Sequence, residues 1–121
     1  MSILYIVATP IGNLEDITKR ALRVLSGVDL ILCEDTRKTR ILLDRFQVKT
    51  LTLSYHQHSK IEKINYIADL LRQQKNIALV SDAGTPGISD PGNKLIEQLL
   101  SFKIEELKIV PVPGASAVAA A

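Results

Sequence analysis

Short apolar runs alternate along the chain with longer segments in which apolar residues recur every three or four positions. The short runs are rich in β-branched residues and predict buried strands, whereas the longer segments predict amphipathic helices. The predicted strands span residues 3–8, 28–33, 50–54, 77–81 and 107–110. The predicted helices span residues 16–26, 36–46, 59–74 and 90–102.

Strands that alternate with helices indicate βαβ units. The expected fold class is therefore α/β, with a mainly parallel five-stranded sheet and helices on both faces. Local signals support two of the helix starts. Ser59 and Glu62 have the spacing of a capping box, and Asp90 followed by Pro91 is typical of an N-cap and a first helical residue.

In a parallel sheet the ligand crevice lies beyond the carboxyl ends of the strands. Four loops are expected at that edge, at residues 9–14, 34–37, 82–90 and 111–116. The third is the most informative, because glycines and prolines restrict its shape and let a ligand approach its backbone. Its length and its two carboxylates favour a functional role over a simple connection.

The other loops leave more than one interpretation open. The first has a single glycine, which excludes the dinucleotide fingerprint and the P-loop and favours a tight turn capped by Asn13. After the second strand, Asp35 or Thr36 caps the next helix, or Glu34 or Asp35 accepts a hydrogen bond or a proton in the crevice. The small residues at 113–117 allow close approach of a ligand or close helix–sheet packing.

Composition narrows the class without naming a ligand. The 121 residues are 46% hydrophobic and carry a net charge of +2, which fits one folded domain and is too mild to indicate nucleic acid binding. The single cysteine, Cys33, fits a reducing cytoplasm and a buried position at a strand end. His56 and His58 are spaced poorly for a metal site, so a surface loop is favoured over substrate contact.

The two ends of the chain carry further expectations. The N-terminus lacks a basic region and a long apolar run, so no signal peptide is expected. No apolar stretch approaches the roughly 20 residues of a membrane span. The last residues resemble the first turns of a helix without a C-cap, which is typical of a boundary inside a longer protein.

Five separated motifs occur in a characteristic order: LYIVATPIGNL at 4–14, CEDTR at 33–37, SYH at 54–56, VSDAGTPGISDPG at 80–92 and VPGASA at 112–117. Together they resemble the tetrapyrrole (corrin/porphyrin) methylases, and within that superfamily the branch that methylates a ribose 2′-hydroxyl of 16S ribosomal RNA. The resemblance spans the whole chain. Members have about twice this length, so residues 1–121 are expected to form the N-terminal domain, with the C-terminal domain absent.

The resemblance implies that S-adenosylmethionine is the methyl donor, that a cytidine of 16S ribosomal RNA in the small subunit is the substrate, and that the enzyme is a cytoplasmic homodimer. No metal is implied. The residues implied to border the donor are Pro10, Asp82, Ala83, Gly84, Thr85, Pro86, Ile88, Ser89, Gly114, Ala115 and Ser116.

The reaction needs a group that accepts the hydroxyl proton, and the candidates are Glu34, Asp35 and Asp82. The candidates for RNA contact are Arg37, Lys38, Arg40 and His56. Two other interpretations remain: a methyltransferase acting on a tetrapyrrole precursor, and a folded domain fragment that is inactive alone. The versions of the loops at 33–37 and 82–86 favour the RNA branch over the tetrapyrrole one.

Overall fold

A computed structural model describes residues 1–9, 17–55, 60–82 and 90–112. The strands are β1 (Ser2–Thr9), β2 (Leu30–Cys33), β3 (Thr52–Ser54), β4 (Ile77–Asp82) and β5 (Leu107–Val112). The helices are α1 (Lys19–Gly27), α2 (Thr36–Arg45), α3 (Ile61–Arg72) and α4 (Asp90–Ser101). The predicted type and order of these nine elements are confirmed.

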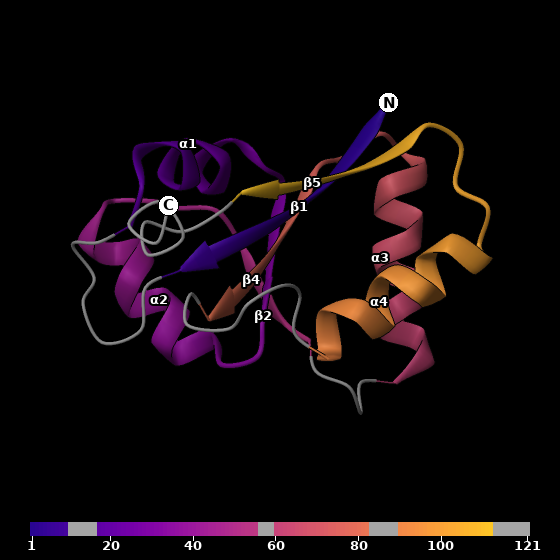
Figure 1. The fold of residues 1–121 in the computed structure, drawn as a ribbon. Helices are drawn as coiled ribbons and strands as arrows, with labels where there is room; N and C mark the ends of the chain where they lie inside the picture. Colours follow the sequence, from indigo (N-terminus) through magenta and orange to yellow (C-terminus); the bar gives the residue numbers. More distant parts are fainter. Residues whose placement is uncertain (10–16, 56–59, 83–89, 113–121) are drawn as a thin grey trace.

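The strands form one sheet in the order β3-β2-β4-β1-β5. All four strand pairings are parallel, which confirms the predicted fold class. Each parallel connection must cross over the sheet, and the four helices supply those crossovers. Figure 1 shows α1 and α2 on one side of the sheet and α3 and α4 on the other.

Each face of the sheet has its own core. Leu4, Leu32 and Ile77 pack under α3 and α4, whereas Val7 and Ile31 pack under α1 and α2. Residues from the same strand enter opposite cores because successive side chains of a strand point to opposite faces. With both faces covered, β2 is buried along its whole length, which explains why it has an unbroken apolar run.

Two helices begin two or three residues later than predicted. The first helix begins at Lys19, with the Thr18 hydroxyl accepting a hydrogen bond from the Ala21 amide at 3.1 Å, so the cap is Thr18 and not Asn13. The third helix begins at Ile61 after Lys60, which makes no side-chain cap. The predicted capping box assigned that role to Ser59, which lies outside the described residues, as does Asn13.

Candidate ligand-binding edge of the sheet

The carboxyl ends of all five strands lie along one edge of the sheet, because the strands are parallel. Thr9 at the end of β1 is in register with Asp82 at the end of β4. Cys33 at the end of β2 is in register with Ser54 of β3. The segments that the sequence singled out as loops therefore start from neighbouring points of this edge.

Strand β4 is the point in the sheet where the following helix packs on a different face from the helices after the neighbouring strands. It lies between β2 and β1, and it leads into α4, which packs on the opposite face from α1 and α2. The helix that follows β4 thus lies on the opposite face from the helices that follow its two neighbours (Figure 1). Ligands of open α/β sheets bind at such switch points, and the backbone of Asp82 ends β4 at this one.

Two candidate carboxylates, Glu34 and Asp35, follow β2, and the structure gives them different surroundings. Asp35 is the N-cap of α2, and its Oδ1 accepts hydrogen bonds from the amides of Arg37 at 2.9 Å and Lys38 at 3.2 Å. The capping interpretation is therefore confirmed for Asp35. Glu34 is exposed at the same edge, and no interaction within the described residues holds its carboxylate.

The cap predicts a selective effect on stability. Asp35→Ala is expected to lower the free energy of unfolding by about 1 kcal/mol, because two amides lose their acceptor. Asp35→Asn keeps a capping oxygen and is expected to cost only a small part of that. Denaturant unfolding of the full-length protein measures both. Equal losses for the alanine and asparagine variants would contradict the capping role.

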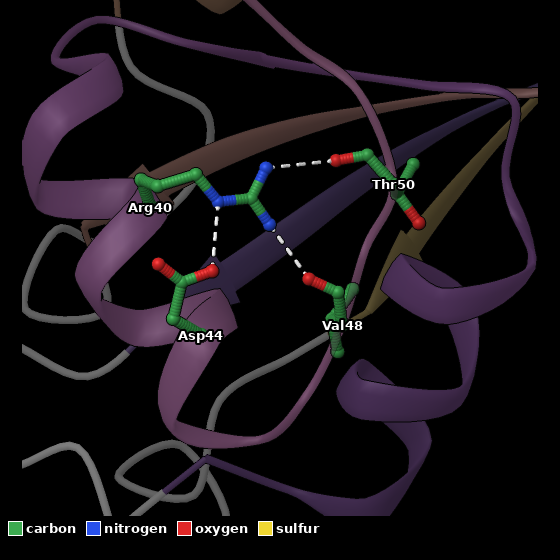
Figure 2. A network of polar contacts seen from close by, with 4 residues as sticks. All are labelled: Arg40, Asp44, Val48 and Thr50. Atoms are coloured by element: carbon green, nitrogen blue, oxygen red, sulfur yellow. Dashed lines mark hydrogen bonds and ion pairs between the residues drawn. The ribbon is translucent and has the colours of Figure 1, made fainter.

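Arg40, a candidate for RNA contact, is held by the protein itself (Figure 2). Its Nε donates to the Asp44 carboxylate at 3.1 Å, and its two terminal nitrogens donate to the carbonyls of Thr50 at 3.1 Å and Val48 at 2.6 Å. The Thr50 hydroxyl in turn donates to the Leu25 carbonyl at 2.7 Å. Arg40 thus ties α2 to the chain that enters β3, and its contact with RNA stays a prediction.

Removing this guanidinium is expected to destabilise the fold. Arg40→Ala leaves two partly buried carbonyls without their donor and is expected to cost about 1–3 kcal/mol. Arg37→Ala is the matched control, because Arg37 is an exposed arginine of the same helix with no side-chain partner among the described residues. Thermal denaturation should show a lower midpoint for the Arg40 variant alone. Equal midpoints would show that the network contributes nothing to stability.

Two polar groups at the edge were not anticipated from the sequence. The Lys63 ammonium of α3 donates to the Ser54 carbonyl at 2.7 Å and to the Ser54 hydroxyl at 3.1 Å, which fastens α3 to the end of β3. Tyr55 is buried directly after that strand, and burial raises the pKa of its phenol. No local sequence signal predicts the Lys63–Ser54 hydrogen bonds or the burial of Tyr55, because both depend on packing between different elements.

Cys33 is buried at the end of β2, as predicted. Burial raises the pKa of its thiol, and a hydrogen bond from Thr39 only partly opposes that shift. The thiol is therefore protonated at neutral pH, and it is not an activated nucleophile.

Several predicted site residues lie outside the described residues, and Asp82 is described only by its backbone. Those outside are Pro10, His56, Ala83, Gly84, Thr85, Pro86, Ile88, Ser89, Gly114, Ala115 and Ser116. Among the described residues no group of three His, Cys, Asp or Glu side chains is arranged to hold a metal ion. In the same part of the chain no helix is long and apolar enough to cross a membrane.

Solved structures with this fold include a putative cobalamin synthesis related protein (CobF) from Corynebacterium diphtheriae. It superposes with a TM-score of 0.73 at 17% identity, over 98% of this chain and 55% of that chain. Cobalt precorrin-4 methyltransferase, CbiF, gives a TM-score of 0.70 at 22% identity, over 98% of this chain and 48% of that chain. At these identities the likeness shows the fold alone.

Curated relatives are much more similar in sequence. A protein of Synechocystis sp. named Ribosomal RNA small subunit methyltransferase I is 52% identical over all 121 residues, which are 42% of its length. Proteins of the same name from Haemophilus influenzae and Thermotoga maritima are each 51% identical over 95% of this chain, which corresponds to 40% and 51% of their lengths. The chain thus spans about two fifths to one half of these relatives.

A family profile agrees with the motifs and with the topology. The family described as Tetrapyrrole (Corrin/Porphyrin) Methylases matches residues 3–121. Apart from Ser2, the match covers all nine strands and helices and all five sequence motifs. This chain belongs to the tetrapyrrole (corrin/porphyrin) methylase family.

Proposed function

We propose that this chain is the N-terminal domain of a two-domain enzyme that uses S-adenosylmethionine to methylate the ribose 2′-hydroxyl of a cytidine in 16S ribosomal RNA. The observation that carries the proposal is the 52% identity, over the whole chain, to a protein named Ribosomal RNA small subunit methyltransferase I. The relatives extend well beyond the segment they share with this chain, which supports a second domain.

The topology of the described residues fits an extended donor. The carboxyl end of β4 lies where the flanking connections diverge, so a ligand there can reach the loops after β1, β4 and β5 together. The loop residues 83–89, with Pro10 and the turn at 114–116, form the donor-binding side in this proposal. S-adenosylmethionine supplies a methyl group on a sulfonium, which is already a good leaving group.

The residues of the chain then position the hydroxyl and accept its proton. Positioning supplies much of the rate of an in-line displacement. Of the three carboxylates, Asp35 is occupied as a helix cap, which leaves Glu34 and Asp82 as the stronger candidates for the proton acceptor. Arg37 and Lys38 follow Glu34 in the first turn of α2, are exposed and are suited to hold phosphates. The proposed enzyme is a cytoplasmic homodimer.

Mass spectrometry of 16S ribosomal RNA tests the function. In cells that lack the gene, one 2′-O-methylcytidine is expected to disappear, and the full-length gene is expected to restore it. An unchanged set of ribose methyl groups would overturn the proposed substrate. A change in tetrapyrrole intermediates in the same cells would instead support the alternative substrate class.

A further inference from the structure

We propose that RNA approaches the carboxyl edge from the side that carries α1 and α2, and that Lys19, Arg20 and Arg23 of α1 extend the cationic surface of Arg37 and Lys38. These five residues are called the α1–α2 cationic surface below. The inference rests on the proposed function, since it names the face through which that function's substrate is held.

Charge is divided unequally between the two sides of the molecule. Residues 17–55, which include α1 and α2, contain eight Lys and Arg against four Asp and Glu. The described residues 60–82 and 90–112, which include α3 and α4, contain seven of each. Within the described residues, the segment that carries α1 and α2 is therefore positive, and the segments that carry α3 and α4 are neutral. Glu15 and Asp16, which precede α1 in the sequence, lie outside the described residues. A basic face of this kind attracts the phosphate backbone of a nucleic acid.

The topology brings the two basic helices to the same edge. Each helix runs back across the sheet after a parallel strand, so its first turn lies near the carboxyl ends of the strands. Lys19 and Arg20 are in the first turn of α1, and Arg37 and Lys38 are in the first turn of α2. β1 and β2, the strands that precede these helices, are separated only by β4, so the strands themselves are about 10 Å apart.

The position of these cations is unfavourable for the helices themselves. The amino end of a helix carries partial positive charge and favours acidic side chains. Neither α1 nor α2 has an acidic residue in its first turn, whereas α3, on the opposite face, has Glu62 there. Helix stability therefore gives no reason for basic residues at these positions. A polyanion bound to the first turns of both helices would explain the basic residues there.

The local hydrogen bonds leave the cations available. Thr18 and Asp35 already serve as acceptors for first-turn amides, so the basic side chains have no part in capping. Asp44 is paired with Arg40, and Asp29 accepts from the Asn76 amide at 2.8 Å. Three of the four carboxylates in the described segment 17–55 are thus engaged elsewhere. The five cations are exposed, and none has a side-chain bond within the described residues.

Arg23 completes the outward row of α1. It lies three and four positions after Arg20 and Lys19, so the three side chains share one helix face. Ala21 and Leu25 occupy the opposite face of that helix and are buried against the sheet. The cations of α1 are therefore on the exposed face of the helix, and α1 lies on the same side of the sheet as α2 (Figure 1).

Binding of the full-length protein to a 16S ribosomal RNA fragment tests the inference. The variants are Lys19→Gln with Arg20→Gln, and Arg37→Gln with Lys38→Gln. The charge-matched control is Lys75→Gln with Lys103→Gln, which removes two exposed lysines from the α3–α4 side. Affinity is measured at several salt concentrations, together with the affinity for S-adenosylmethionine and the thermal midpoint.

Each pair on the α1–α2 cationic surface is expected to weaken RNA binding about tenfold or more near physiological salt, and to reduce the salt slope by about one for each cation removed. Donor affinity should be unchanged, and the thermal midpoint unchanged or higher, because a charge unfavourable to the helix is gone. If the wild type binds RNA and the α1 pair behaves like the control, the inference is overturned. Failure of the wild type to bind RNA would count against the proposed function.

Discussion

Asp82→Asn in the full-length protein is expected to lower the rate of ribose methylation about 10²–10⁴-fold, the usual contribution of a proton acceptor. Asp82 ends β4, in register with Thr9 of β1, where the connections diverge to the two faces. Asparagine keeps the size of the side chain and removes its basicity. A single-turnover assay with saturating S-adenosylmethionine separates this loss from weaker binding of the donor.

The two other carboxylates provide the controls for Asp82→Asn. Glu34→Gln changes an exposed residue of the same edge and is expected to have a smaller effect. Asp35→Asn retains the helix cap and is expected to keep both the rate and the stability. Wild-type turnover of Asp82→Asn, with unchanged donor affinity, would remove Asp82 from the reaction. A large loss in Asp35→Asn at full stability would transfer the role to Asp35.

Ile77→Ala is expected to lower the free energy of unfolding by about 2–5 kcal/mol, because it leaves a cavity that the surrounding residues fill only in part. Ile77 is 0% exposed and lies between Leu30 of β2 and Leu4 of β1 in the centre of the sheet. It belongs to the core beneath α3 and α4. The midpoint of urea unfolding in the full-length protein measures the loss.

Ile61→Ala is the matched control for the core substitution. Ile61 begins α3 and is 55% exposed, so its replacement removes the same atoms without opening a cavity. We expect a change within about 0.5 kcal/mol. Similar losses for the two isoleucines would mean that the packing of β4 is not what stabilises the domain.

The start of α1 could not be predicted from local sequence signals. The apolar residues that recur along 16–26 predicted α1, yet the helix starts at Lys19 with Thr18 as its cap, whereas the sequence favoured a turn capped by Asn13. Both residue types cap helices well. The choice depends on where the helix must meet the sheet so that Ala21 and Leu25 enter the core, which no short stretch of sequence specifies.

The basic residues of α2 have roles that the sequence alone does not separate. Arg37, Lys38 and Arg40 lie in one run of basic residues that was predicted to contact RNA, and Arg37 and Lys38 are exposed. Arg40 is in the same run, but the carbonyls of Val48 and Thr50 lie within reach of its guanidinium. Those carbonyls belong to the segment that enters β3, so its structural role became visible only in three dimensions.

By itself, the sequence determined the nine elements, their parallel α/β arrangement and the edge at which the loops meet, because hydrophobic periodicity and turn residues act over a few positions. Only the tertiary structure decided that β4 inserts between β2 and β1 and that α1 and α2 share a face of the sheet. Strand order and the pairing of faces follow from packing between distant segments, where the core residues of both layers must be buried at once.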